Sequence, residues 1–207
     1  HIVICAHKSP DGDAIGSSLA WKLYLNQIGK TDVTLCMPDA YPDFLQWLPE
    51  ANTVLRYDKN PEKVQETFNR ADLVCCLDFN QYARVEAMRS TLEGCKAKRI
   101  LIDHHLEPQT DNAITISQPN MSSTSEMIFY IISQLGGYND MTKDCAQCIY
   151  CGMMTDTGGF TYNSTRPEIY FVIGQLLSKG ILLGSGDRPN QLYASDFQVT
   201  FSCIRLL

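Results

Sequence analysis

The sequence lacks both a long apolar run and a block of basic residues. No uninterrupted apolar stretch approaches the ~18 to 20 residues that a membrane-spanning helix needs, and no basic segment precedes the first apolar run, as a secretion signal would require. Lys and Arg number 17 against 23 Asp and Glu, which gives a formal net charge of −6. Tight binding to long duplex nucleic acid depends on many neutralised phosphates, and this charge argues against it. We therefore expect no membrane segment and no long duplex partner, while short anionic ligands stay open if metal ions supply positive charge.

Charged residues are also scarce, at 19% against the ~25% usual in globular proteins, while apolar residues make up 44%. A chain of 207 residues with this composition can bury a sizeable core in one large domain or two small ones. The chain lacks an initiator Met and His1 lies directly in an apolar run, so we expect the natural protein to begin earlier. The nine Cys form an odd count and several lie in apolar runs, which is typical of free thiols in a reducing, cytoplasmic setting.

Short runs of β-branched and apolar residues alternate with segments of helical periodicity. The expected strands are Ile2–Ala6, Asp32–Met37, Thr53–Tyr57, Leu73–Leu77, Arg99–Ile102 and Ala113–Ile116. The expected helices are Ala14–Ile28, Pro61–Asn69, Tyr82–Glu93, Ser123–Leu135, Lys143–Met154 and Pro167–Ser178. Strands that alternate with helices imply right-handed crossovers between parallel strands. The predicted fold class is α/β, a doubly wound, mainly parallel sheet flanked by helices.

The last third of the chain is expected to be helical and to close over one side of the sheet. Two of its helices begin with a hydroxyl residue and a Glu three positions on, Ser123 with Glu126 and Thr165 with Glu168, which is the pattern of a capping box. The stretch Gly180–Asn190 contains three Gly and one Pro, which is typical of a loop or linker.

His and Asp residues gather directly after three of the expected strands. The three clusters are His7-Lys8-Ser9-Pro10-Asp11-Gly12-Asp13, the single Asp78, and Asp103-His104-His105. The carboxyl ends of parallel strands meet at one edge of a sheet, where ligands bind. So many carboxylates repel one another unless a cation neutralises them, and carboxylate with imidazole is the ligand set for Mn²⁺, Mg²⁺, Fe²⁺ or Zn²⁺. Taken singly, Asp13 could also be a helix N-cap, Asp78 a turn residue and His7 a loop histidine.

The order of these motifs resembles the DHH phosphoesterase superfamily. The resemblance rests on His7-x3-Asp11-Gly12-Asp13-Ala14-x-Gly16-Ser17, Asp78, Asp103-His104-His105, Ser122-Ser123-Thr124-Ser125-Glu126 and Thr155-Asp156-Thr157-Gly158. Within the superfamily, the spacing is similar to that of the oligoribonuclease and pAp-phosphatase (nano-RNase) group, often labelled exopolyphosphatase-related, which has cyclic di-AMP phosphodiesterase relatives. The resemblance covers roughly residues 1–180. It departs from the family at Lys8-Ser9, where another polar pair is expected.

The resemblance implies a centre of two divalent cations, most often Mn²⁺, with Mg²⁺ as the other candidate. His7 and Asp11 would hold one ion, Asp78 would bridge the two, and the second ion would take Asp13, His104 and Asp156. Asp156 is implied by the resemblance alone, since the residues Thr155–Gly159 otherwise indicate a polar turn. Asp78, His104 and His105 are the expected catalytic residues. His105 would contact a phosphate oxygen or assist the leaving group, and Ser123 at the start of its helix would help to bind substrate. Asp103 would either orient an adjacent His or only close its strand.

The resemblance also implies a division of the chain. Residues 1–180 would form the catalytic domain, and residues 181–207 would form a linker and the start of a missing C-terminal substrate-binding domain. The implied activity is Mn²⁺-dependent hydrolysis of phosphate esters in short nucleotides such as oligoribonucleotides, pAp or cyclic di-AMP. Which of these is the natural substrate, whether polyphosphate is one, and whether the chain forms a homodimer all stay open at this stage.

Two other functions compete with hydrolysis. A nucleotide-sensing module would keep the fold and the metals but regulate a partner without turnover. Alternatively, Cys145-x2-Cys148-x2-Cys151 would begin an iron–sulfur or zinc site, but position 155 is Thr where a fourth Cys would be needed. We expect these three cysteines to pack in the core as small apolar residues.

Overall fold

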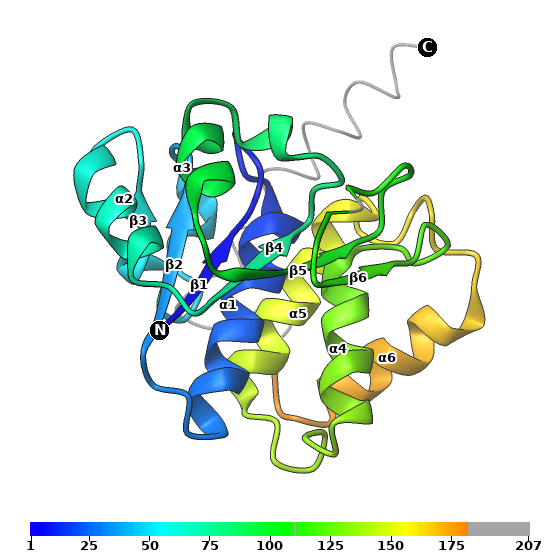
Figure 1. The fold of residues 1–207 in the computed structure, drawn as a ribbon. Coiled ribbons are helices and arrows are strands. Elements are labelled where there is room, and N and C mark those ends of the chain that lie inside the picture. Colours follow the sequence, from blue (N-terminus) through cyan, green and yellow to red (C-terminus); the bar gives the residue numbers. More distant parts are fainter. Residues whose placement is uncertain (110, 182–207) are drawn as a thin grey trace.

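The computed structural model describes residues 1–109 and 111–181. These residues form a six-stranded sheet between two layers of helices (Figure 1). The strands are β1 (Ile2–Cys5), β2 (Val33–Met37), β3 (Leu55–Arg56), β4 (Leu73–Leu77), β5 (Lys98–Asp103) and β6 (Ile114–Ser117). Their order in the sheet is β3-β2-β1-β4-β5-β6, and every neighbouring pair is parallel. The prediction of a doubly wound α/β fold is confirmed.

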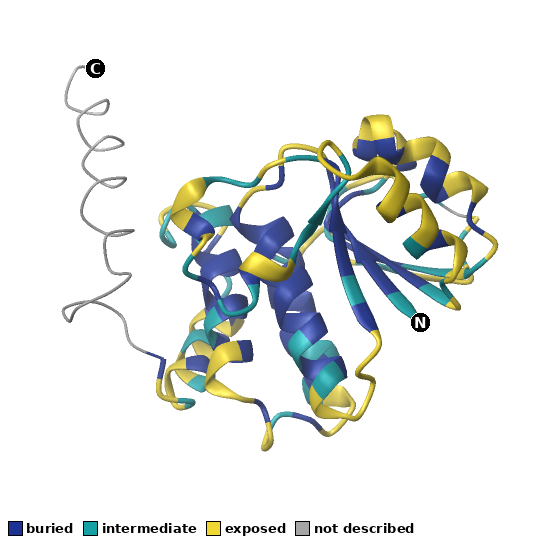
Figure 2. Ribbon diagram, turned by 90° about the vertical axis from the view of Figure 1, so that its left-hand side faces the viewer, coloured by how far each residue is buried: buried dark blue, intermediate teal, exposed yellow. Residues whose placement is uncertain are grey.

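Helices cover both faces of the sheet. They are α1 (Gly12–Gln27), α2 (Pro61–Asn69), α3 (Arg89–Gly94), α4 (Thr124–Gln134), α5 (Lys143–Asp156) and α6 (Pro167–Leu177). Side chains of a strand point alternately to its two faces, so Ile4 of β1 packs in one apolar core while Val3 and Cys5 pack in the other. The larger core lies under α1, α4 and α5, and the smaller core lies under α2 and α3 (Figures 1 and 2).

The strand order reverses between β1 and β4. The chain winds from β1 outward through β2 to β3, then returns to β4 on the other side of β1 and winds outward again to β6. Loops that leave two adjacent strands in opposite directions open a crevice beyond their carboxyl ends. The loop carrying His7 follows β1, and Asp78 follows β4, so the fold places the first two predicted clusters at this crevice.

The predicted helix Tyr82–Glu93 is wrong as a single element. The structure has a 3-10 helix over Tyr82–Met88 and then α3, with a break at Glu86, whose φ is 41°. The buried residues Tyr82, Val85 and Met88 repeat every three positions, which matches the three residues per turn of a 3-10 helix. The predicted strand Thr53–Tyr57 also shortens to Leu55–Arg56, because only these residues pair with β2.

The C-terminal helices follow the prediction, except that α5 continues two residues further, to Asp156; α6 begins at Pro167, as expected. Arg166 and Pro167 begin that helix, so the capping box expected at Thr165 is wrong; Pro at the first helical position already has the required φ and no N–H to satisfy. Cys145, Cys148 and Cys151 are buried on α5, as expected of core residues. The predicted linker and second-domain start lie outside the described residues beyond residue 181. Within the described ranges, no helix combines the length and apolar character required to cross a membrane.

Two glycines let helices α1 and α5 approach closely. A Cβ atom on Gly16 of α1 would lie 2.6 Å from the carbonyl oxygen of Cys148 on α5. A Cβ atom on Gly152 of α5 would lie 1.9 Å from Ser125 Oγ on α4 and 2.9 Å from Asp13 Oδ1. Both positions are too crowded for any other residue without a shift of the surrounding atoms. The two glycines therefore determine how closely three helices pack directly beside the polar clusters.

We predict that Gly16→Ala destabilises the protein, because the new methyl group would press on the backbone of α5. The expected loss in free energy of unfolding is about 1–3 kcal/mol. Gly174→Ala is the matched control, since Gly174 lies in α6 and a Cβ atom added there would meet no other atom within 4 Å. Removing this helical glycine should raise stability by up to about 1 kcal/mol. Urea unfolding of both variants checks the pair, and equal effects would contradict the close packing.

Candidate metal centre

His7 enters the crevice from the loop after β1. Its side chain is almost fully buried, with the residue 5% exposed. Its Nδ1 lies 2.7 Å from the carbonyl oxygen of Lys8, and this contact directs Nε2 toward two carboxylates. Nε2 is 3.8 Å from Asp11 Oδ1 and 3.5 Å from Asp78 Oδ2. These three side chains form a group whose ligand atoms all lie within 4.8 Å of one another.

The two acidic residues at the start of α1 have different roles. Asp11 is the N-cap of this helix and accepts hydrogen bonds from the N–H groups of Asp13 and Ala14. The alternative role of Asp13 as the cap of its own helix is thereby ruled out. Asp13 instead accepts from the first N–H groups of α4, with 2.6 Å to Thr124 N and 2.8 Å to Ser125 N. The sequence does not reveal this contact, because it joins residues 111 positions apart.

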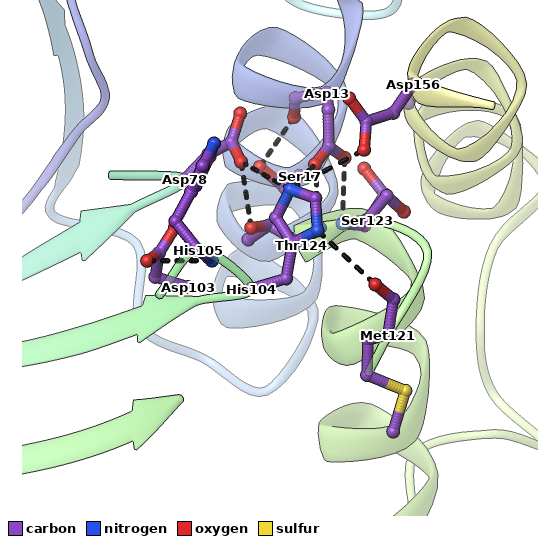
Figure 3. A network of polar contacts seen from close by, with 12 residues as sticks. Asp13, Ser17, Asp78, Asp103, His104, His105, Met121, Ser123, Thr124 and Asp156 are labelled. Atoms are coloured by element: carbon purple, nitrogen blue, oxygen red, sulfur yellow. Dashed lines mark hydrogen bonds and ion pairs between the residues drawn. The ribbon is translucent and has the colours of Figure 1, made fainter. Parts of the chain in front are cut away.

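Asp78 presents its two carboxylate oxygens to different partners. Oδ2 faces His7. Oδ1 lies 3.6 Å from His104 Nε2 and accepts a hydrogen bond of 2.9 Å from Thr124 Oγ1 (Figure 3). The residue is 2% exposed and has a positive φ of 62°, a conformation that Asp tolerates better than most residues. A backbone held in this region at the end of a central strand is typical of a functional position.

His104 gathers the remaining acids. Its Nε2 is 3.9 Å from Asp13 Oδ2 and 3.5 Å from Asp156 Oδ2, and its Nδ1 is 3.4 Å from the carbonyl oxygen of Met121 (Figure 3). Asp156 is the last residue of α5, so the helix runs two residues beyond its predicted end and the polar turn starts later. Asp13, His104 and Asp156 form a second group of ligand atoms within 4.8 Å of one another.

His105 lies beside this group and is held by Asp103. The fully buried carboxylate of Asp103 lies 2.7 Å from His105 Nδ1 and also accepts a 3.0 Å hydrogen bond from the His105 backbone N–H. The expectation that Asp103 orients a neighbouring His agrees with this contact. His105 also belongs to a third candidate ligand group, with Asp78 and His104. Its ring is half-buried and its Nε2 makes no described hydrogen bond within residues 1–109 and 111–181.

The carboxyl groups of the cluster repel one another strongly. Burial raises the pKa of Asp78 well above its ordinary value, and the neighbouring Asp13 raises it further. Burial likewise raises the pKa of Asp13, and burial together with Asp13 raises the pKa of Asp156 to about 7. Burial lowers the pKa of His7, but its hydrogen bonds to Asp11 and Asp78 outweigh this effect and bring that pKa to about 10.

The donor set fits the binding of divalent cations. Buried carboxylates that take up protons this readily need a positive charge between them, and each of the two groups offers oxygen and imidazole nitrogen ligands. One group contains His7 and Asp11, the other contains Asp13, His104 and Asp156, and Asp78 lies between them with one oxygen toward each histidine. The structure thus brings together all six residues expected to bind metal.

Ser123 has a structural role in this arrangement. It is fully buried and its Oγ accepts from the Glu126 N–H as the N-cap of α4. The first free N–H groups of that helix do meet an anion, but the anion is Asp13 of the same chain. Binding of substrate by Ser123 therefore stays a prediction. Thr124 contacts Asp78, and Met121 contacts His104. The sequence gives no signal for either contact, because neither residue type is characteristic of a metal site.

The chain resembles known proteins along most of its length. The DHH family, N-terminal domain, matches residues 1–153. The chain is 32% identical over 182 residues to the bifunctional oligoribonuclease and PAP phosphatase NrnA of Thermus thermophilus, covering 88% of this chain and 51% of that protein. It is 29% identical to the protein of the same description from Bacillus subtilis, covering 96% of this chain and 58% of that protein.

A solved structure is also similar. An exopolyphosphatase-related protein from Bacteroides fragilis superposes with a TM-score of 0.85 at 49% identity, covering 87% of this chain and 53% of that one. The chain thus spans about half the length of the relatives that it matches.

We predict that Asp156→Asn stabilises the protein once metal has been removed with a chelator. A carboxyl whose pKa rises from 3.8 to about 7 on folding binds its proton more tightly when folded, so the metal-free protein loses stability as the pH rises through this range. At pH 8, Asn should regain on the order of 1–2 kcal/mol, allowing for the partial exposure of the side chain. Chemical denaturation at pH 5 and pH 8 measures the effect.

Asp140→Asn is the control for this prediction, because it removes the same charge from an exposed position. It should leave the dependence of stability on pH unchanged. A native-like pH profile in Asp156→Asn would contradict the raised pKa assigned to this carboxyl group from its burial and from the neighbouring Asp13.

Proposed function

This chain belongs to the DHH family, and from that premise we propose that it is the catalytic part of a metal-dependent phosphoesterase that hydrolyses short nucleotides. In this proposal residues 1–180 form the catalytic domain. Residues from 181 onward lead to a further domain that helps to bind the substrate, in keeping with a chain that spans about half the length of its relatives.

One observation carries the proposal: Asp78 lies between two groups of ligands and turns one oxygen to each. His7 and Asp11 would hold one cation, Asp13, His104 and Asp156 the other, and Asp78 both. Cations held by these residues would lower the pKa of a bound water and would neutralise phosphoryl oxygens. Mn²⁺ suits mixed carboxylate and imidazole ligands, and Mg²⁺ is the second candidate.

The protein groups around the cations have separate tasks. The carbonyl oxygens of Lys8 and Met121 face the Nδ1 atoms of His7 and His104 and leave each Nε2 for a cation. His105 is fixed through Nδ1 by Asp103, so its Nε2 is left for a phosphate oxygen or the leaving group. We therefore assign catalytic roles to Asp78, His104 and His105.

The proposed substrates are short oligoribonucleotides and pAp, with cyclic di-AMP as a further candidate. Support comes from the curated relatives, whose descriptions name oligoribonuclease and PAP phosphatase activities. Each of these substrates is small and anionic, and a chain of net charge −6 accepts such a substrate only where cations supply positive charge in the site. All eight described cysteines are free thiols, which supports a cytoplasmic setting for the enzyme. A homodimer stays a prediction.

We predict that Asp78→Asn lowers Mn²⁺-dependent turnover by at least about 100-fold, because an amide cannot bridge two cations. Asn keeps the shape of the side chain and an acceptor for Thr124, so the fold should persist. Hydrolysis of a 5′-labelled dinucleotide, pAp and cyclic di-AMP by the full-length protein measures the effect, with Mn²⁺ and Mg²⁺ compared and bound metal determined. Asp140→Asn should match the native rate.

The same assay separates the enzyme from a sensing module. Turnover of at least one substrate that is lost in Asp78→Asn supports the phosphoesterase and ranks its substrates. Two bound metals in the native protein with no turnover of any substrate would favour a regulatory role instead. Turnover that persists in the variant would remove Asp78 as the bridge.

A further inference from the structure

Arg166 lies outside every motif of the family resemblance. It contacts Asn120 and Met121 directly and is linked to Ser122 through Glu126. These residues, Asn120, Met121 and Ser122, connect β6 to α4. Arg166 lies directly before α6, where its Nε is 3.9 Å from Oε2 of the exposed Glu168. Glu126, Met121 and Asn120 lie 40 residues or more from it along the chain. The sequence offers no signal for these distant contacts, because an Arg before a helix is ordinarily a solvated residue.

The buried carboxylate of Glu126 is the first partner of Arg166. Glu126 is fully buried, and its Oε1 pairs with Nη2 of Arg166. Its Oε2 accepts hydrogen bonds of 2.7 Å from Ser122 N and 2.8 Å from Ser122 Oγ. The capping box predicted at Ser123 is therefore half right: Ser123 caps Glu126 N, but the Glu126 carboxylate binds Ser122 instead of returning to Ser123. Glu126 thus transmits the position of the guanidinium to Ser122.

The second terminal nitrogen of the guanidinium, Nη1, binds the backbone directly. Nη1 of Arg166 donates a 2.6 Å hydrogen bond to the Asn120 carbonyl oxygen and lies 3.4 Å from Met121 Sδ. A planar fork of donors can satisfy two such partners at once, whereas the single ammonium of Lys cannot hold both in this geometry. Arg166 therefore fixes the backbone on both sides of Met121.

Met121 connects this clamp to the metal centre. Its carbonyl oxygen lies 3.4 Å from His104 Nδ1, while His104 Nε2 faces Asp13, Asp78 and Asp156 (Figure 3). A carbonyl can only accept, so this contact keeps the proton on Nδ1 and leaves the lone pair of Nε2 free for a cation. Partners of this kind typically change metal affinity by 10–100-fold.

We infer that Arg166 is a positioning residue for the cation bound by Asp13, His104 and Asp156, acting through Met121 on His104. This inference rests on the proposed two-metal function. Arg166 does not reach the ligands itself. It holds the carbonyl group that sets the proton position and the orientation of the His104 ring.

Two variants of Arg166 test the inference on the full-length protein. Arg166→Lys keeps a positive charge beside Glu126 but loses the planar guanidinium group that donates to two partners at once. The double variant Arg166→Met with Glu126→Gln removes both charges, so that no unpaired carboxylate stays buried and the fold is retained. Arg56→Lys is the matched control, because Arg56 makes a two-point pair with Asp58 at 3.0 and 2.6 Å on β3, the opposite edge strand from β6.

Two measurements read the result without enzymatic activity. Titration with Mn²⁺ alone, against a competing chelating dye, should show that one of two sites weakens about 10–100-fold while the other changes less than about twofold. The second measurement is a long-range ¹⁵N–¹H spectrum of the metal-free protein, with the His104 signals assigned from His104→Gln. In the Arg166 variants, it should show that the His104 ring proton is no longer fixed on Nδ1. The control should match the native protein in both measurements.

Unchanged Mn²⁺ affinity in both Arg166 variants, or an equal loss at both sites, would overturn the inference. A native protein that binds no Mn²⁺ would instead remove the proposed function. In that event the metal-free spectra still decide the positioning role, because an unaltered His104 tautomer in the variants would show that the clamp does not act on the ring.

Discussion

Two buried carboxylates, Asp13 and Asp78, impose the condition on which the rest of the structure depends. A charge buried this deeply must meet hydrogen-bond donors or a cation, because the protein interior otherwise penalises it by several kcal/mol. The amide N–H groups of α4 meet Asp13, and the Thr124 hydroxyl meets Asp78. The positive end of the α4 dipole thus faces the same anions that would hold the metals. The same contacts therefore determine both the position of α4 and the positions of the proposed metal ligands Asp13 and Asp78.

The sequence predicts those parts of the fold in which apolar residues follow a regular spacing. The central strands and the long helices α1, α4 and α5 follow from buried apolar runs and helical spacing, and a parallel sheet then brings the ends of β1, β4 and β5 to one edge. Short elements were harder, because tertiary contacts decide them: the break at Glu86 and the two-residue strand β3 have no strong local signal. The start of α6 at Pro167 agrees with the predicted helix, whereas the capping box expected at Thr165 is absent because Arg166 takes the N-cap position.

The site itself divides along the same line. The histidines and aspartates that follow strands could be named from their positions, since strand ends converge. Asp156 could not, because it comes from the end of α5 and only resemblance to a family singles it out. The residues that orient the ligands were hidden from the sequence altogether. Met121 acts through its backbone carbonyl, and a carbonyl is present at every position of the chain.

The contact between α1 and α5 has a consequence for how this centre tolerates change. Asp13 lies three positions before Gly16 on one helix, and Asp156 lies four positions after Gly152 on the other, so each proposed ligand shares a helix face with one of these glycines. The distance between the Asp13 and Asp156 carboxylates is thereby determined by how closely the backbones of α1 and α5 approach each other. Two glycines outside the proposed ligand set therefore determine the spacing of two residues within it. A designer who wished to resize this centre for a larger ion would begin with the spacing of the helices and leave the ligands as they are.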